Sequence, residues 1–263
     1  MISALAPLTA IVIACIAGGV LAIVAAAGTL ALHPRWISRL ISFAVGALLG
    51  AVFLELLPHA LEQGGTERAM MTMLAGLLLF FLLEKLVLWR HSHDSAEALG
   101  HGNGPAGHTH GGAGTRPGLM IVIGNSVHNF CDGIVIAATF IADFALGTTT
   151  ALAIVAHAIP QQVGDFAVLM HSGYTRRRAF VYNLATGVAT LAGGLAGYAA
   201  LAAMQHILPT VLALAAASLL YVAVADLIPS LHQHPAPAQT AVQLLLIGIG
   251  IGIIGLVHVA LEH

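Results

Sequence analysis

Eight long apolar segments constrain this sequence more than any other feature. Each has at least about 20 residues, the length that a helix needs to cross the hydrocarbon core of a bilayer. A transmembrane strand would instead show about 10 residues of alternating polarity. The segments cover roughly residues 5–32, 37–60, 70–90, 118–141, 147–171, 178–204, 207–230 and 239–261. The sequence therefore predicts an all-α, polytopic membrane protein with eight transmembrane helices in a single domain, residues 1–263.

The composition agrees with a chain that has little mass outside the membrane. Of its residues 59% are hydrophobic and 8% are charged, whereas a soluble domain has about 25% charged residues. The first apolar segment has no positive region before it, so we expect a transmembrane helix rather than a cleaved signal peptide. Cys15 and Cys131 both lie in apolar segments and imply no disulfide framework. The expected environment is a lipid bilayer, and the absence of a basic patch argues against nucleic acid as a partner.

The distribution of Lys and Arg predicts the orientation of the chain, because cytoplasmic loops are enriched in these residues. One side of the membrane would carry a single such residue, Arg68. The other side would carry eight: Arg35, Arg39, Lys85, Arg90, Arg116, Arg176, Arg177 and Arg178. We therefore expect the second side to be cytoplasmic and both termini to lie outside the cytoplasm. The compact Ala- and Gly-rich chain favours the inner membrane of a bacterium.

One long connection, residues 91–117, separates the third and fourth segments. It contains five histidines among Gly, Ala, Ser and Asn: His91, His93, His101, His108 and His110. This composition cannot bury a core, so we expect a disordered cytoplasmic loop. Neutral imidazoles bind metal ions, and the loop could take up an ion that leaves the membrane. The alternative is a flexible linker in which the histidines are incidental.

Two apolar segments, the fourth and the fifth, each contain a cluster of polar residues. His128 and Asp132 are four residues apart on one helical face, and so are His157 and Gln161. Ionisable residues inside membrane helices are costly and usually functional. Two imidazoles, a carboxylate and an amide oxygen suit Zn²⁺ or another first-row divalent ion better than Ca²⁺ or Mg²⁺. We therefore predict an intramembrane metal site formed by these four side chains.

Three further polar residues of these segments are expected to line the path of the ion: Asn129, Gln162 and Asp165. Asp165 lies eight residues after His157, on the same face, and could instead brace the inner end of its helix. A different interpretation of the whole cluster is a hydrogen-bonded network that only stabilises the bundle.

A shorter similarity links the second and seventh segments. Glu55 and Asp226 each precede a proline by three residues, near the end of their segment. The two segments should run in opposite directions, as in the inverted repeats of many transporters. We predict that Glu55, His59 and Asp226 lie at the entrance and exit of the path. Chance similarity between two apolar helices is the alternative.

At these polar clusters the sequence resembles the ZIP family of divalent metal-ion (zinc/iron) transporters. The His-Asn-Phe-x-Asp-Gly motif of one branch is complete from His128 to Gly133. The family's second motif, His-Glu-x-Pro-x-Glu/Gln-x-Gly-Asp, matches at His157, Pro160, Gln162, Gly164 and Asp165. The resemblance implies a ZIP-like fold with an inverted repeat and uptake of zinc into the cytoplasm, with Fe²⁺, Mn²⁺, Co²⁺ and Cd²⁺ as further candidates. It also implies a homodimer in which a bundle of helices carries the ion past static helices.

The sequence departs from this pattern at Ala158, where the motif has glutamate. In relatives that hold two ions, this acid and an acid in the sixth span bind the second, and the sixth span here offers only Asn183. The resemblance therefore implies one ion in this chain. A transporter, not an enzyme, is the leading interpretation. A membrane-embedded metalloenzyme or a metal sensor is the alternative.

Overall fold

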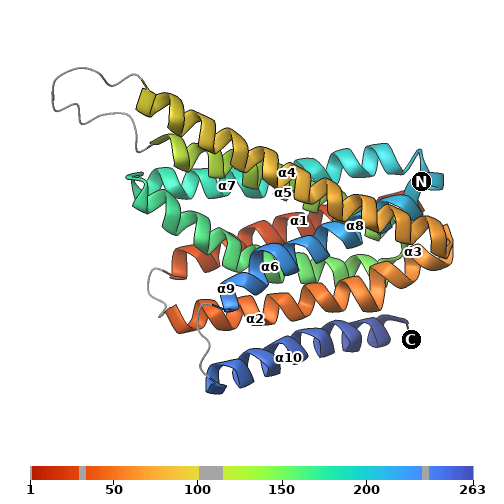
Figure 1. The fold of residues 1–263 in the computed structure, drawn as a ribbon. Coiled ribbons are helices and arrows are strands. Elements are labelled where there is room, and N and C mark those ends of the chain that lie inside the picture. The colour runs from red at the N-terminus through yellow and green to blue at the C-terminus, as the bar shows by residue number, and fades with distance from the viewer. Residues whose placement is uncertain (1, 30–33, 101–114, 233–236, 263) are drawn as a thin grey trace, which may run out of the picture.

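The computed structural model describes residues 2–29, 34–100, 115–232 and 237–262. Its long helices cross the molecule roughly side by side (Figure 1). They are α1 (Ile2–Thr29), α2 (Pro34–Gly50), α3 (Leu57–Gly64), α4 (Thr66–Gly100), α5 (Thr115–Ala142), α6 (Phe144–His171), α7 (Arg176–Leu201), α8 (Leu208–Tyr221), α9 (Ile228–Leu231) and α10 (Pro237–Glu262), with the π-helical segments η1 (Ala51–Leu56) and η3 (Val222–Leu227) and the 3₁₀ turn η2 (Gln205–Ile207). No strand occurs in these residues, which confirms the all-α class.

The eight predicted spans correspond to these helices. Seven stretches of the described chain are long and apolar enough to cross a membrane. The second of them joins α2, η1 and α3, and the seventh span joins η2, α8, η3 and α9. The remaining span is α5, whose 28 residues include the polar cluster that lowers its hydropathy. The chain is therefore a multi-pass membrane protein.

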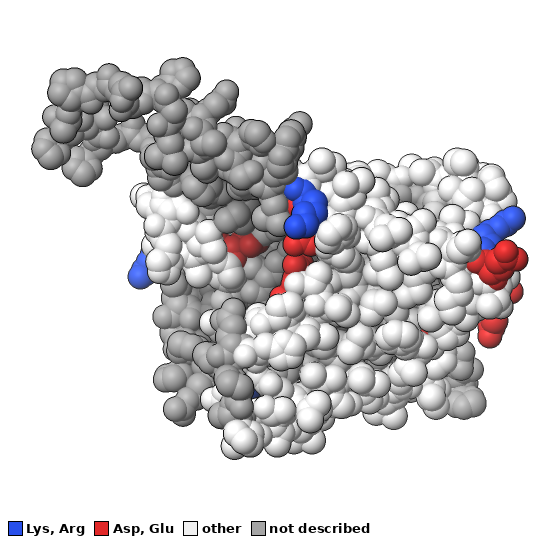
Figure 2. All heavy atoms as spheres, viewed as in Figure 1, with Lys and Arg blue, Asp and Glu red and all other residues white. Residues whose placement is uncertain are grey.

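The surface of the molecule fits contact with lipid. Uncharged residues cover most of the described surface on the face seen in Figure 2. Large apolar side chains point outward along several helices, among them Ile13, Leu78 and Leu256. In water such a surface would be a liability, whereas lipid tails cover it at no cost. The buried interior instead collects small residues and the polar side chains described below.

Both π-helical segments end two residues before a proline, and both contain an acidic residue. The Leu57 N–H donates to Val52 O in the second span, and the Ile228 N–H donates to Ala223 O in the seventh. In each case the bond spans five residues instead of four, so the helix is locally widened. Figure 1 shows α2 and α8 running in opposite directions. The similarity between the Glu55 and Asp226 segments therefore extends from sequence to backbone geometry, and π-bulges are frequent at functional sites.

Glycine allows two pairs of helices to approach closely. A Cβ atom on Gly133 of α5 would lie 2.0 Å from Thr190 O of α7, and one on Gly193 would lie 1.9 Å from Phe130 O. A Cβ on Gly46 of α2 would lie 2.1 Å from Ile247 O of α10. Small residues at helix contacts are the usual means of association in lipid, where the hydrophobic effect does not draw helices together. These contacts fix α5 against α7 and α2 against α10.

The histidine-rich connection differs from the prediction at both ends. α4 continues to Gly100, and α5 begins at Thr115, so the parts of 91–117 next to the spans are helical rather than disordered. The sequence from Ala96 to Leu99 consists of strong helix formers without a proline, which allows the helix to continue past the third span. Residues 101–114, with His101, His108 and His110, lie outside the described residues.

We predict that Gly250→Val destabilises the protein more than Gly248→Val, although both residues lie in α10. A Cβ at Gly250 would lie 2.5 Å from Phe43 O, whereas a Cβ at Gly248 meets nothing within 4 Å. Overpacking costs about 1–3 kcal/mol or more when the neighbour is backbone, and the helix-propensity change is the same in both variants. Thermal unfolding in detergent, followed by size-exclusion chromatography, measures the difference. Equal loss of stability in the two variants would contradict the close α2–α10 contact.

Candidate metal centre

Three side chains from α5 and α6 converge inside the bundle. α5 supplies His128 and Asp132, one helical turn apart, and α6 supplies His157. His128 Nε2 lies 3.4 Å from His157 Nε2 and 3.5 Å from Asp132 Oδ2. His157 Nε2 lies 3.4 Å from Asp132 Oδ2. Atoms that bind Zn²⁺ tetrahedrally at about 2.0–2.1 Å are about 3.3–3.4 Å apart, so this nearly equilateral triangle has the size that one such ion requires.

The burial of these side chains differs. Asp132 and His157 are each 1% exposed, whereas the side chain of His128 keeps 22% of its exposure. Asp132 Oδ1 has no hydrogen-bond partner among the described residues. A carboxylate buried in this way is unfavourable unless a cation or a proton accompanies it. The cluster can therefore hold a cation that arrives past His128.

The orientation of His157 suits a ligand. Its Nδ1 lies 3.4 Å from Ala153 O in the preceding turn. A proton on Nδ1 would be shared with this carbonyl, which leaves the lone pair of Nε2 directed at Asp132 and His128. Metal-binding histidines commonly use a backbone carbonyl in this way to fix the tautomer.

The other predicted site residues lie around this cluster in different ways. Asn129 Oδ1 accepts a hydrogen bond from Thr190 Oγ1 (3.1 Å), and Gln162 Nε2 donates to Thr186 Oγ1 (2.9 Å). Both amides therefore face α7. Asn183 of α7 also donates to Gln162 O (3.1 Å). These bonds join α5, α6 and α7 into one polar network.

Gln161 and Asp165 are both half-buried on α6. Gln161 shares a face with His157 by helical spacing, and none of the described hydrogen bonds connects it to the three converging side chains. The carboxylate of Asp165 accepts a hydrogen bond from the Asn125 side chain. This contact fits the predicted bracing role as well as it fits a place on the path.

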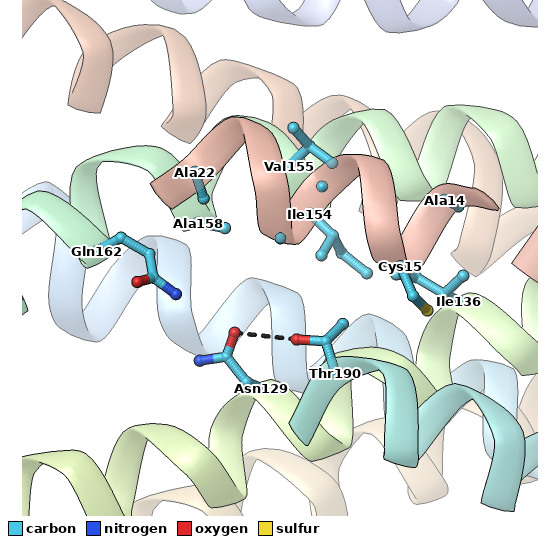
Figure 3. Close-up of a pocket in the computed structure, with 12 residues that line it drawn as sticks. Ala14, Cys15, Ala22, Asn129, Ile136, Ile154, Val155, Ala158, Gln162 and Thr190 are labelled. Carbon is cyan, nitrogen blue, oxygen red and sulfur yellow. Dashed lines mark hydrogen bonds between the residues drawn. The ribbon is translucent and has the colours of Figure 1, made fainter. Parts of the chain in front are cut away.

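A cavity of about 20 Å³ lies beside the cluster, between α1, α5, α6 and α7. Figure 3 shows Asn129 and Gln162 pointing into this region, with Ala158 and the small residues of α1 above them. Gln162 Oε1 has no hydrogen-bond partner among the described residues. Histidine, aspartate and glutamate are absent from the residues that line this cavity. The space next to Ala158 therefore provides two amides, a hydroxyl and the thiol of Cys15 but no carboxylate.

The predicted entrance and exit residues have opposite environments. Glu55 is 0% exposed, and its Oε2 lies 2.9 Å from Nδ1 of His258 in α10. His59 Nδ1 lies 3.0 Å from Glu55 O. Asp226 is exposed and near enough to His128 and His157 for their charges to interact. The acid of the second span is thus buried in the bundle, whereas that of the seventh is exposed and lies within electrostatic range of the metal cluster.

Two residues near these acids were not predicted. Glu84 of α4 accepts a hydrogen bond from the Tyr221 hydroxyl and interacts electrostatically with Asp226. His258 is the partner of Glu55 described above. The available signal for His258 was an isolated histidine in an otherwise apolar span, which is itself a reason to expect a partner.

The fold and this cluster define a polytopic membrane protein with a buried His–Asp–His site. The profile of the ZIP zinc transporter family matches residues 3–116 and 90–258, and the chain belongs to this family. It is 32% identical over 226 residues to zinc transporter ZIP13 of Pongo abelii, covering 80% of this chain and 63% of that protein. It is 32% identical over 248 residues to human zinc transporter ZIP4, covering 73% of this chain and 38% of that protein. The chain thus spans less than two thirds of either relative.

We predict that Thr190→Val weakens the bundle, because Asn129 Oδ1 then loses its buried donor from α7. Hydrogen bonds between membrane helices contribute about 0.6 kcal/mol on average and up to about 1.7, so the loss should fall in this range. Thr148→Val is the matched control, because the Thr148 hydroxyl donates to Phe144 O of its own helix. Unfolding in mixed detergent micelles measures both. An equal effect of the two substitutions would contradict a stabilising bond between α5 and α7.

Proposed function

We propose that this protein transports divalent metal ions, zinc above all, into the cytoplasm through a site shared by α5 and α6. The observation that carries the proposal is the triangle of His128, Asp132 and His157. Its sides of 3.4–3.5 Å match the distances between the ligand atoms of a small, tetrahedrally coordinated ion. Two imidazoles and one carboxylate favour a borderline ion such as Zn²⁺ over Ca²⁺ or Mg²⁺. Fe²⁺, Mn²⁺, Co²⁺ and Cd²⁺ are further candidate substrates.

The fourth ligand is assigned to Gln161, one helical turn from His157, or to a water in its place. Three protein ligands with an exchangeable fourth position allow an ion to enter and leave, whereas a closed four-residue site would retain it. Asn129, Gln162 and Asp165 are assigned to the wall of the path. Their contacts with neighbouring side chains are of the kind that position a wall residue.

The exit of the path is assigned to Asp226 and Glu84. Asp226 interacts electrostatically with Glu84 and with His128 and His157, and the two neighbouring acidic groups would lower the energy of a cation between them. The surplus of Lys and Arg in the loops supports the assignment of this side to the cytoplasm. On this basis both termini lie outside the cytoplasm, and the protein resides in a bacterial inner membrane. The helical ends of the histidine-rich connection would continue the path of the ion.

We also propose that the protein is a homodimer, by analogy with its family.

Movement of the ion is assigned to a group of helices rather than to side chains alone. α5 packs against α7, and α1 packs against α6 and α7, so the metal cluster is carried by a four-helix unit. α2 packs against α10, and α4 packs against α8. Sliding of the unit formed by α1, α5, α6 and α7 past the remaining helices would expose the metal cluster to one side of the membrane at a time. Transporters with repeats that rock around a central site work in this way.

The alternatives have less support. A metalloenzyme needs a general base beside a metal-bound water, and position 158 carries alanine where the family motif has glutamate. A sensor would bind metal without moving it. The names of the relatives, zinc transporters, favour transport over both.

We predict that replacing His128 and His157 together by alanine abolishes zinc uptake. Loss of a residue that only supports a metal ligand costs about 10–100-fold in affinity, so loss of two ligands should weaken zinc binding by more than about 100-fold. Calorimetric titration and uptake of zinc by proteoliposomes measure the two effects. His171→Ala, at the exposed end of α6, is the control.

Each outcome of this experiment separates the candidate functions. Uptake that persists in the double variant would rule out the proposed site. Zinc binding by the unmodified protein without any flux would favour the sensor, and turnover of a substrate without net ion movement would favour the enzyme.

We predict that one zinc ion binds per chain. The cavity next to Ala158 lacks the carboxylate that a second ion requires. Ala158→Glu should raise the stoichiometry to two, whereas Ala158→Gln, of the same size but neutral, should leave it at one. Metal analysis after equilibration with zinc and anomalous diffraction at the zinc edge both report the number. Two fully occupied ions in the unmodified protein would contradict this assignment.

A further inference from the structure

The second span contains a buried carboxylate on the side of the molecule opposite the proposed exit at Asp226. Glu55 lies in η1 and is 0% exposed. Its Oε2 is 2.9 Å from Nδ1 of His258, and the side chain of His258 retains 23% of its exposure. The pair therefore joins η1 to α10, with the glutamate fully buried and the histidine partly exposed at the surface of the bundle.

The total charge of this pair decides whether it can be buried. An isolated carboxylate in a low-dielectric interior is very unfavourable, and burial becomes tolerable when the pair as a whole is neutral. Glutamate with a neutral imidazole carries a net charge of minus one. One added proton gives a neutral pair, either as a carboxylic acid with imidazole or as a carboxylate with imidazolium. The closed arrangement thus requires one proton more than the separated, ionised glutamate and neutral histidine.

Other titratable groups on the helices packed against η1 are few. α2 has Arg35 and Arg39 at its opposite end, α3 has His59 and Glu62, and α8 has only Tyr221. α6 has His157, Asp165 and His171, and α10 has Glu262 in addition to His258. Of these, His59 lies against the backbone of Glu55 through its Nδ1. No Lys or Arg occurs in α3, α6, α8 or α10, so these four helices supply no fixed positive charge to the carboxylate.

The corresponding acid of the seventh span provides a comparison. Asp226 lies in η3, also three residues before a proline, and is exposed. The same local backbone thus carries a sealed acid in one span and an open acid in the antiparallel span. If the two spans are related by an inverted repeat, the sealed acid marks the closed side of the molecule and the open acid marks the other side.

We propose that Glu55 and His258 form a proton-binding latch on the outer side of the protein. Closing the latch takes up one proton from the outer solution, and opening it releases this proton, leaving a solvated carboxylate and a neutral imidazole. The proposal rests on the alternating access of the proposed function. It makes the outer opening dependent on pH, independently of the metal cluster.

The sign of this dependence follows from linkage. The closed state binds more protons than the open state, so acid favours closure and alkali favours opening. In water a carboxyl group titrates near about pH 4.3 and an imidazole near about 6.5. Above about pH 6.5 the open pair therefore lacks the proton that the closed pair holds, and the ratio of open to closed rises by up to about tenfold per pH unit.

A buried thiol tests the latch without metal. Ala60 in α3 is 0% exposed and lies one turn beyond Glu55, so Ala60→Cys should react with a maleimide only when the outer side opens. Ala203→Cys, at an exposed position after α7, reports the ordinary effect of pH on thiol reactivity. The unsubstituted chain gives the background from Cys15 and Cys131. The measurement uses the full purified chain in detergent with a chelator, from about pH 6.5 to 8.5.

The expected result is a ratio of Ala60→Cys to Ala203→Cys labelling rates that rises with pH. Adding Glu55→Gln should make this ratio independent of pH, because the neutral amide closes without a proton. His258→Gln should raise the ratio at all pH values and flatten its slope, because the carboxylate loses its partner; it carries the test if the Glu55 variant does not fold. His206→Gln, exposed on η2, should leave the slope unchanged.

An unchanged slope in either folded latch variant overturns the proposal, and so does the absence of labelling at Ala60→Cys at every pH. Since no metal is present, the result does not depend on whether the His128 and His157 cluster binds zinc. Loss of zinc uptake in variants of that cluster would bear on the transport proposal alone.

Discussion

A carboxylate inside a membrane bundle must be matched by positive charge, and this constraint organises the two polar sites of the chain. A charged residue at the centre of a span costs about 2.5–3.5 kcal/mol on insertion scales. Asp132 lies 3.4–3.5 Å from two imidazoles and Glu55 lies 2.9 Å from one imidazole, so each group can take up a cation or a proton that compensates the carboxylate. Two imidazoles around one carboxylate leave room for a divalent ion between three ligand atoms. One imidazole nitrogen at 2.9 Å from a carboxylate oxygen leaves room for a proton but not for a divalent ion.

The distances in both sites depend on how closely the helices approach, and glycine sets this approach. Gly133 and Gly193 bring the backbones of α5 and α7 into contact, and Gly46 does the same for α2 and α10. At the first contact, Asn129 reaches Thr190, which fixes the rotation of the helix that carries His128. At the second contact, α10 comes near enough to the widened segment η1 for His258 to reach Glu55. Lipid does not draw helices together as water does, so contacts of this kind are what define the geometry of the sites.

Features that depend on a single helix, such as the position of a span or the face on which a residue lies, are well predicted from the sequence. Each span had to be apolar over about 20 residues, so the eight spans were predictable, and the four-residue spacing of His128 and Asp132 placed both on one face. His157 was assigned to the same site from its polar surroundings and from the family motif. Contacts between distant spans were harder to predict: nothing near Glu55 in the sequence indicates His258, about 200 residues further on. The π-helical segments were missed because a proline preceded by an acid permits an α-helix as well, and the continuation of α4 to Gly100 was missed because its histidines suggested disorder.

The two π-helical segments connect the metal path with the latch. Each widens its helix before a proline and contains an acidic residue, and their spans run in opposite directions. With the acid of η1 buried and that of η3 exposed, the proposed path would be open from the cluster of His128, Asp132 and His157 toward Asp226 and closed toward Glu55. On the proposed path, a divalent cation that leaves past Asp226 would remove positive charge from the bundle, whereas a proton held at Glu55 would keep the opposite side neutral and closed. Opening of the proposed latch would release the proton and expose a carboxylate, which would attract the next cation. Under this proposal Glu55 first closes the outer side and then attracts the cation, and the change between the two roles requires one proton.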